Sequence, residues 1–284
     1  MEILGIDIGG SGIKGAPVDT VSGTLRAERL RIDTPQPSTP EAVTEVVCAL
    51  VRHFEWTGAV GCAFPAIVKS GVTRSAANVD KGWVNYPAQE SLGRHTGCPL
   101  LLSNDADAAG IAEVPFGAGK TRSGLVLVIT LGTGIGSAMF YRGALVPNSE
   151  LGHLEIRGRE AEKWTASVVR KRKGLKWKEW GARLNDYLAH LEFIFSPDLF
   201  ILGGGVSRRF ERFSPYLNLE TEVVPAALRN DAGIIGAALA ARSLSGASSS
   251  AATASFRRDR TKDGPRAARK SPARGPLLRP RKMR

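Results

Sequence analysis

The beginning of the chain alternates between apolar and polar residues as β-strands do. The alternation covers residues 2–8, 13–19 and 24–32, and short glycine-containing segments separate these runs. Successive side chains of a strand point to opposite faces, so the pattern predicts a three-stranded antiparallel meander. A proline-rich stretch at 34–40 ends it. Residues 41–54 then have the three- and four-residue spacing of a helix.

Farther along, buried strands and helices alternate. Continuous apolar runs bounded by turn residues predict strands, whereas apolar residues at steps of three or four predict helices. The expected strands are residues 58–64, 98–105, 125–131, 135–143 and 198–202, and the expected helices are residues 106–117, 176–195 and 231–244.

Two segments of the sequence are alike. Residues 6–15 (IDIGGSGIKG) and 129–137 (ITLGTGIGS) both contain a strand, a glycine-rich turn, an isoleucine and a second strand. Such an internal repeat predicts a duplicated α/β fold with two lobes and a central cleft. We expect an N-terminal lobe at 1–119, a C-terminal lobe at 120–242 and a tail at 243–284.

The net charge of +12 lies mostly in that tail. Residues 243–284 hold 12 Lys and Arg against 2 Asp, a net +10, which leaves 27 basic and 25 acidic residues, a net +2, in the rest. The tail is rich in Ser, Ala, Pro and Arg, so we expect it to be disordered. The alternative is an arm that attracts polyanions. The nearly neutral body has no base-reading motif, which argues against specific nucleic-acid binding.

Three cysteines, Cys48, Cys62 and Cys98, are far apart in the sequence and form no CxxC pair. This argues against a disulfide framework and favours a reducing, cytoplasmic location. The first residues have no basic region of the kind that opens a signal peptide. The apolar run at 125–131 is too short to cross a membrane.

Residues 116–121 (FGAGKT) contain the Gly-Lys-Thr triplet of a phosphate-binding loop. Such a loop has a glycine five residues before the last one, follows a strand and opens a helix. Here that position is Val114, and the expected helix precedes the expected strand. We therefore interpret the segment as the end of a helix, with Lys120 near its C-terminus.

The two repeated turns are better candidates for holding phosphate. Glycine-rich turns let backbone N–H groups approach an anion closely. Either turn alone is ambiguous, because most glycine hairpins are only hairpins; two turns that face each other across a cleft are more specific. The candidate residues are Gly9, Gly10, Ser11 and Lys14 in the first turn, Gly132, Thr133 and Gly134 in the second, and Asp7 as an acid beside them.

Five motifs in order resemble the ROK sugar kinases of the actin/hexokinase superfamily. They are GIDIGGSGIKGAPVD, LSNDADAAGIAE, TLGTGIGSA, ELGH and FILGGGVS, and they span residues 1–242. The resemblance implies an actin-like (ribonuclease H-like) ATPase fold. The stretches TPQPSTP, NVDKGW, VPNSELGHLEIRGREAEK and SPDLFILGGGVS narrow it to the polyphosphate glucokinases of this family.

Two features that many ROK proteins have are missing from this sequence. No cysteine follows Cys98, so the zinc-binding CxCGxxGC cluster is absent, and we expect no zinc site. No helix-turn-helix precedes residue 2, which argues against the repressor members.

The resemblance implies roles for particular residues. Asp105 is expected to be the base that accepts the proton of the sugar C6 hydroxyl. From the sequence alone, an aspartate before a helix is as well explained as a helix cap. We expect Asp107 either to be that cap or to support the site from behind the residues that contact the substrate. The residues expected to contact the sugar are Asn104, Glu150, His153 and Glu162, with Asn78, Lys81 and Gly82 at the mouth of the site.

The resemblance also implies how the phosphoryl donor is held. Gly203, Gly204 and Gly205 are expected to admit the adenosine of ATP, and Asp7 to orient Mg²⁺ through water. Residues 157–178 carry nine Lys and Arg against two Glu. They are either a solvated helical face or a track for polyphosphate, for which the candidates are Lys163, Arg170, Lys171 and Lys173. We expect the nearby Trp164, Trp177 and Trp180 to pack in the core or at its rim rather than to stack on bases.

The sequence thus predicts a kinase that phosphorylates glucose, with mannose as an alternative acceptor and polyphosphate or ATP as donor. One alternative is a strictly ATP-dependent hexokinase. Another is a non-enzyme that senses sugar or binds polyanions. The sequence leaves open the donor preference and whether the protein is a monomer or a homodimer.

Overall fold

The first half of the chain forms a mixed sheet flanked by helices. In this computed structural model, which describes residues 1–76 and 79–247, the strand order is β3-β2-β1-β5-β8, and β4 also pairs with β2. The hairpin β1–β2 is antiparallel, whereas β5 and β8 run parallel to β1. The elements are β1 (Glu2–Ile8), β2 (Ile13–Asp19), β3 (Thr24–Leu25), β4 (Leu30–Ile32), α1 (Pro40–His53), β5 (Val60–Phe64), β6 (Val68–Lys69), β7 (Val72–Thr73), α2 (Ala88–Thr96), β8 (Leu100–Asn104) and α3 (Asp105–Phe116).

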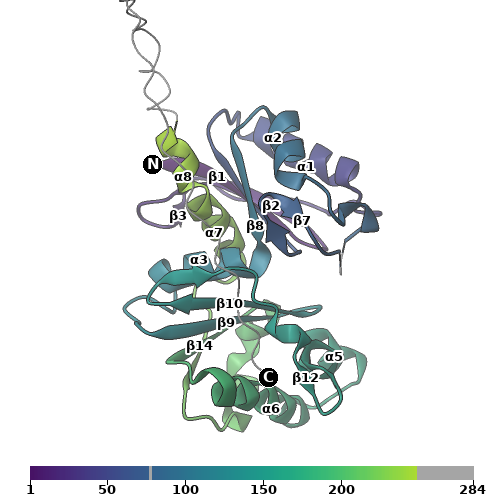
Figure 1. Ribbon diagram of the computed structural model, residues 1–284, viewed down its shortest axis with the longest axis vertical. Helices are drawn as coiled ribbons and strands as arrows, with labels where there is room; N and C mark the ends of the chain where they lie inside the picture. Colours follow the sequence, from purple (N-terminus) through teal and green to yellow (C-terminus); the bar gives the residue numbers. More distant parts are fainter. Residues whose placement is uncertain (77–78, 248–284) are drawn as a thin grey trace, which may run out of the picture.

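The second half repeats this arrangement. Its sheet has the order β11-β10-β9-β14-β15, with β9–β10 antiparallel and β14 and β15 parallel to β9. The duplicated two-lobed α/β fold is therefore confirmed (Figure 1). The elements are β9 (Leu125–Leu131), β10 (Ile135–Tyr141), β11 (Ala144–Val146), β12 (Glu155–Ile156), β13 (Arg159–Glu160), α4 (Ala161–Thr165), α5 (Ser167–Arg172), α6 (Trp177–Phe195), β14 (Leu199–Gly203), β15 (Glu222–Pro225), α7 (Ala232–Ala240) and α8 (Arg242–Ala247).

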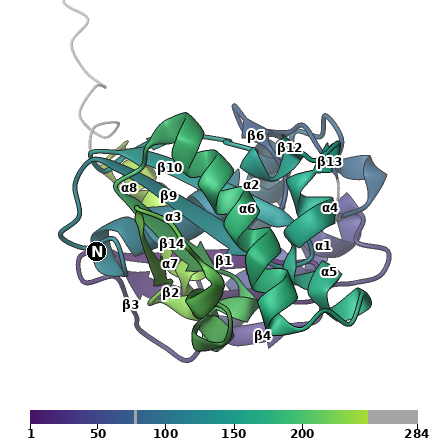
Figure 2. The ribbon, with the colours of Figure 1, turned by 90° about the horizontal axis from the view of Figure 1, so that it is seen from below.

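Each sheet is buried on both faces, which is why its central strands are almost continuously apolar. In β9, Leu127 and Ile129 pack toward α6 while Val126 and Val128 pack toward α3. Figure 2 shows α6 running across one face of the second sheet. In the first sheet, α1 covers one face and α7 the other. Among the described residues, no helix is long and apolar enough to span a bilayer.

Helices α3 and α7 lie between the two sheets and cross the expected boundary at 119/120 (Figure 1). Helix α3 comes from the first half of the chain but packs on β9 and β10, whereas α7 comes from the second half and packs on β1 and β5. The backbones approach closely, because a Cβ at Gly61 or Gly236 would overlap a backbone carbonyl of the neighbouring helix. The two halves thus share their central helices, and the boundary itself stays a proposal.

Several expected elements differ in detail. The third strand expected at 24–32 is broken into β3 and β4, both paired with β2. The last helix, expected at 231–244, is divided into α7 and α8. Helix α2, strand β15 and the short helices α4 and α5 were not predicted. The expected disorder of the tail concerns residues that, from 248 onward, lie outside the described part of the chain.

The segment FGAGKT lies at the end of a helix, as predicted. Helix α3 ends at Phe116, and β9 begins only at Leu125. The backbone N–H groups of Gly117 and Gly119 both donate to the carbonyl of Glu113, at 3.0 and 2.9 Å. These amides therefore close the helix and are not free to bind phosphate.

Candidate active site

A cavity of about 280 Å³ lies between the two lobes. Both glycine-rich turns line it, as does Asp105 at the junction of β8 and α3. The carboxylate and the two turns that the sequence placed far apart therefore share one space. The predicted site residues among those lining it are Gly9, Gly10, Asn104, Asp105, Gly132, Thr133, Gly134, Glu150, His153, Glu162 and Gly204.

The two turns are built alike. In the first, the N–H of Gly9 donates to the carbonyl of Gly12 at 3.2 Å; in the second, the N–H of Gly132 donates to the carbonyl of Gly134 at 3.0 Å. Each turn is also supported from outside. The Arg31 guanidinium donates to the carbonyl of Ser11 at 2.8 Å, and the N–H of Val168 donates to the carbonyl of Gly132 at 3.1 Å. These contacts fix the position of each turn relative to the cavity.

Asn104 caps helix α3. Its side-chain oxygen accepts from the N–H groups of Ala106 and Asp107, at 2.8 and 3.0 Å. Neither Asp105 nor Asp107 therefore has to serve as the cap. Of the two roles expected for Asp107, capping is wrong, and the supporting role stays a prediction. Because its side chain also donates to the carbonyl of Ala66 at 3.1 Å, Asn104 keeps one amide N–H for a sugar hydroxyl.

Asp105 has the electrostatics of a general base. Burial, together with the nearby charges of Asp7 and Glu150, raises the pKa of its carboxyl to about 7, against the opposing hydrogen bond from the N–H of Ala106. A base whose pKa is near neutrality can take up a proton and release it again. The carboxylate also retains a face open to the cavity.

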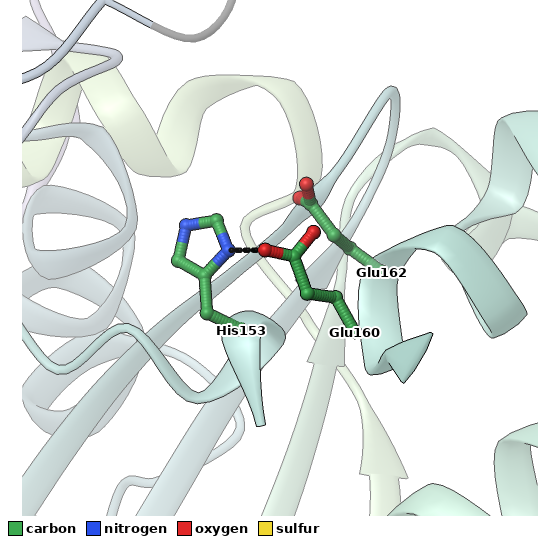
Figure 3. Close-up of side chains that lie close together, drawn as sticks. All are labelled: His153, Glu160 and Glu162. Atoms are coloured by element: carbon green, nitrogen blue, oxygen red, sulfur yellow. Dashed lines mark ion pairs between the residues drawn. The ribbon is translucent and has the colours of Figure 1, made fainter. Parts of the chain in front are cut away.

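Glu150, His153 and Glu162 also line the cavity. Glu150 Oε2 lies 4.0 Å from His153 Nε2. Burial raises the pKa of Glu150, the charge of Glu162 raises it, and His153 lowers it. The other ring nitrogen of His153, Nδ1, lies 3.6 Å from Glu160 Oε1 (Figure 3). Carboxylates and an imidazole this close can accept from and donate to neighbouring hydroxyls of one sugar ring.

Among the described residues, His153, Glu160 and Glu162 are also a group that could hold a metal ion, with ligand atoms within 4.8 Å of one another (Figure 3). Glu160, however, already forms an ion pair with Lys163 at 2.5 Å. His153 and Glu162 line the cavity, where the sequence predicted them to contact the sugar. The expected absence of zinc stays a prediction.

Asp7 and Lys14 form an ion pair of 3.2 Å beneath the first turn. Lys14 is not among the described residues that line the cavity. Its ammonium therefore binds Asp7 and does not contact a phosphate in the cavity directly. Asp7 is close enough to Asp105 for its charge to raise the pKa of that carboxyl. Asp7, like Lys14, is not among the described residues that line the cavity. A carboxylate this close to the cavity is the kind of oxygen donor that a hard cation such as Mg²⁺ prefers.

The expected mouth of the sugar site is only partly described. Asn78 lies outside the described residues. Lys81 and Gly82 are exposed and do not line the cavity. Lys81 donates to the carbonyl of Ala76 at 2.9 Å, and the N–H of Gly82 donates to the side chain of Asp80 at 2.7 Å. Both residues therefore order the loop rather than reach the cavity.

A second hollow, of about 760 Å³, continues from the second turn. We call it the basic groove, because four cations and no carboxylate of the described residues line it. It shares Gly132 and Thr133 with the first cavity, so the second turn separates the two spaces. The residues lining it are Ser11, Leu131, Gly132, Thr133, Ser167, Val168, Arg170, Lys171, Trp177, Gly205, Val206, Arg209 and Arg212.

The basic groove contains half of the expected polyphosphate track. Arg170 and Lys171 line it, whereas Lys163 and Lys173 do not. The other two cations, Arg209 and Arg212, were not predicted. Their sequence signal was the run RRFER at 208–212, which is separated from the glycines 203–205 by two residues. Gly204 lines the first cavity and Gly205 lines the basic groove. Gly203 is the last residue of β14 and lines neither.

The three tryptophans differ in their surroundings. Trp180 is fully buried in the core beneath α6, as expected. Trp177 packs against that core and lines the basic groove, where the Arg170 guanidinium lies 4.0 Å from its ring centroid. Trp164 lies close to Arg159 and Arg183, at 4.8 and 4.3 Å from its ring centroid.

Two duplicated sheets with a cavity between them define the two-lobed, actin-like class of ATPases and sugar kinases. Comparison with known proteins agrees: the model of the ROK family matches residues 3–167. The chain therefore belongs to the ROK family, and the resemblance found in its motifs is confirmed.

Related proteins narrow the comparison. A polyphosphate glucokinase of Mycobacterium tuberculosis is 48% identical over 238 residues, which cover 84% of this chain and 90% of the relative. The crystal structure of inorganic polyphosphate/ATP-glucomannokinase from Arthrobacter sp. strain KM is 51% identical, with a TM-score of 0.83, and covers 86% of this chain and 99% of that one. A ROK family glucokinase from Streptomyces griseus, in complex with glucose and AMPPNP, is 25% identical, with a TM-score of 0.73 and coverage of 86% and 100%.

Proposed function

We propose that this chain is a kinase that transfers the terminal phosphoryl group of polyphosphate or ATP to the C6 hydroxyl of glucose or mannose. One observation carries the proposal: a carboxylate with a pKa of about 7 shares a cavity with glycine-rich turns from both lobes. The relatives named above, a polyphosphate glucokinase and a polyphosphate/ATP-glucomannokinase, support the acceptor and the donors.

The proposed reaction needs few groups. The C6 hydroxyl oxygen attacks the terminal phosphorus, its proton passes to the Asp105 carboxylate, and the bond from that phosphorus to the bridging oxygen breaks. The shortened donor leaves with the electron pair of that bond. The turns at 9–12 and 132–134 hold the phosphates by backbone N–H groups other than those of Gly9 and Gly132, which close the turns. The turns thereby align the terminal phosphate with the hydroxyl.

The sugar is proposed to bind the acidic and imidazole side chains that line the cavity. Glu150, His153 and Glu162 are proposed to bind hydroxyls of the ring, while the remaining amide N–H of Asn104 binds a hydroxyl nearer to C6. Glucose and mannose differ only in the orientation of the C2 hydroxyl, and a wall built of two carboxylates and an imidazole offers acceptors in more than one direction.

Mg²⁺ is part of the proposal, and the carboxylate oxygens of Asp7 suit it. When bound, it would neutralise charge on the donor phosphates. Asp7 is proposed to orient the ion through water, while Lys14 keeps the carboxylate of Asp7 in place from 3.2 Å away.

The donor is proposed to lie in the basic groove. Arg170, Lys171, Arg209 and Arg212 face a chain that carries about one negative charge per phosphate, so a long polyphosphate would contact more of them than the triphosphate of ATP does. The loop at Gly204 and Gly205 leaves room beside the second turn, where a nucleoside would lie.

The direct test is an assay of the full chain with Mg²⁺. We expect sugar 6-phosphate to form from glucose and from mannose, with either polyphosphate or ATP as donor. Product formed with ATP alone would support the strictly ATP-dependent alternative. Sugar binding without any product would support the sensor alternative and refute the kinase.

The basic groove has a test of its own. Replacing Arg209 and Arg212 together by alanine should raise the KM for polyphosphate about tenfold or more, and should flatten its dependence on salt, because fewer counterions are released on binding. The KM for ATP should rise less. Initial rates at several salt concentrations measure both effects.

The matched control removes the same charge elsewhere. Lys173 and Lys178 are exposed, belong to the basic region at 157–178 and do not line the groove. Their double replacement by alanine should leave the KM for polyphosphate within about twofold, since exposed charges at a distance are screened. Equal losses in both double variants would mean that net charge attracts the donor, and not this groove.

Location and assembly stay predictions. The unpaired Cys48, Cys62 and Cys98 agree with the reducing cytoplasm that the sequence favours. Monomer and homodimer both remain open.

A further inference from the structure

A short segment of the first lobe, Pro65 to Val68, forms part of the wall of the cavity and is held by two asparagines. Asn104 donates to the carbonyl of Ala66 at 3.1 Å. Asn148 makes two bonds to Val68: its Oδ1 accepts from the backbone N–H at 2.9 Å, and its Nδ2 donates to the carbonyl at 3.0 Å. The Asn148 side chain therefore pairs with Val68 as a neighbouring strand would.

Asn148 is also fixed through its own backbone. Its N–H donates to Asp107 Oδ2 at 2.9 Å, and Asp107 is almost fully buried. Its φ of 57° lies in the left-handed region, which asparagine tolerates better than most residues. The conformation, the side chain and the amide of Asn148 are thus all set by contacts with Val68 and with the start of α3.

These contacts join the two lobes next to the sugar-facing wall. Asn148 follows β11 of the second sheet, whereas Val68 lies in β6 of the first lobe. Glu150 comes two residues later. On its far side, the N–H of Leu151 donates to the hydroxyl of Ser137 in β10 at 2.9 Å. The segment that contains Glu150 is therefore bonded to the first lobe on one side, through Asn148, and to the second lobe on the other, through Leu151.

We propose that Asn148 is a positioning residue that holds the Glu150–His153 wall against residues 65–68, so that both halves of the sugar site are at binding distance before the sugar arrives. A site that is assembled only part of the time binds its ligand more weakly in proportion to that fraction. Loss of the contact should therefore weaken sugar binding, and leave Asp105 and the donor turns unchanged. The identity of the ligand rests on the function proposed above, but the contact itself does not.

The variant Asn148→Gly tests this directly. Glycine keeps the left-handed backbone and the N–H that Asp107 accepts, and it removes only the two bonds to Val68. We expect the KM and the Kd for glucose to rise about tenfold, which corresponds to about 1.4 kcal/mol of lost binding free energy. We expect kcat to stay within about threefold and the KM for the donor within about twofold.

Hydrogen exchange gives a readout that does not depend on activity. The amide of Val68 should exchange faster in Asn148→Gly by a factor of ten or more, whereas the amides of central strand β9 should not change. The matched control is Asn85→Gly, because Asn85 also has a left-handed backbone (φ 59°), is exposed and lies outside the cavity lining. Asn148→Asp, which sets an oxygen against the carbonyl of Val68, should raise the KM for glucose as well.

The outcomes separate the two proposals. A Kd for glucose and a Val68 exchange rate that both match the wild type would refute the positioning role. A fall in kcat without a rise in the KM for glucose would refute it too. If the wild-type chain binds no sugar, the proposed function fails, and unchanged Val68 exchange in Asn148→Gly would separately refute the contact between the lobes.

Discussion

Replacing Asp105 with asparagine should lower kcat by about 10³- to 10⁴-fold and leave the KM for glucose within about threefold, because the amide keeps the volume but cannot accept a proton. The amide oxygen can still accept the N–H of Ala106, as the carboxylate does at 2.8 Å, so the fold should not change. Initial rates of sugar 6-phosphate formation measure the loss. Asp186→Asn, on α6 and paired with Arg157, is the control and should keep its activity.

The same substitution should change the pH dependence. Asp105 must be ionised to act as a base, so kcat/KM of the wild type should fall about tenfold per pH unit below about pH 7. Asp105→Asn should lack this fall. A wild-type profile that stays flat from pH 8 to pH 5, or a variant with near-normal kcat, would show that another group takes the proton.

Stability should move in the opposite direction to activity. The pKa of Asp105 is raised from 3.8 to about 7 in the folded protein, so the folded state binds this proton more tightly than the unfolded state. The associated stability is fully present below about pH 4 and is lost as the pH rises through 7. Asp105→Asn should therefore be more stable than the wild type at pH 8, by up to about 4 kcal/mol, and this advantage should vanish toward pH 4. Urea unfolding at both pH values tests this.

Strands that are buried on both faces could be predicted from the sequence, because their apolar runs are continuous. The run at 125–131 became β9 with those same bounds. Edge strands were harder, since their pattern depends on what lies beside them. Between β3 and β4, Arg26 turns to Asp19 and Arg29 turns to Asp231 ahead of α7. These ion pairs lie where the chain leaves the sheet between β3 and β4. They join residues far apart in the sequence, so the local sequence pattern does not predict them.

The exchange of helices between the lobes could not be predicted either. Periodicity indicates that α3 and α7 are buried, but not which sheet buries them. The small residues of α7 allow it to pack closely against α3. At Gly236, for example, any side chain would overlap the carbonyl of Ala108. Interpreting that glycine requires knowing its neighbour in space.

The candidate site was predictable where the chemistry needs a motif and unpredictable where it needs only charge. Glycines and an aspartate at fixed spacings identified both turns and Asp105. Arg209 and Arg212 were missed because exposed arginines in a short helical segment resemble any solvated surface. Lys163 seemed equally suitable for the donor, but Glu160 three residues earlier holds its ammonium at 2.5 Å.

Replacing Glu113 with alanine should destabilise the protein by about 3–5 kcal/mol, the cost typical of breaking a buried charged network. Glu113 is 1% exposed, and its carboxylate accepts from three backbone N–H groups: Ala118 at 2.9 Å, Ala227 at 3.0 Å and Leu228 at 2.7 Å. Without the carboxylate, these three backbone donors lose their acceptor. Urea unfolding measures the loss, and Glu155→Ala, at an exposed glutamate, should change stability by no more than about 0.5 kcal/mol.

Glu113→Gln separates charge from shape. It retains one oxygen acceptor but turns an amide N–H toward backbone donors, so we expect a loss between those of the wild type and the alanine variant. A loss below about 1 kcal/mol in Glu113→Ala would mean that water replaces the carboxylate. Gly117 is required here for a related reason, because a Cβ at that position would overlap Glu113 Oε2. The loop FGAGKT therefore does donate one backbone N–H, that of Ala118, to an anion, and the anion is the protein's own Glu113 carboxylate.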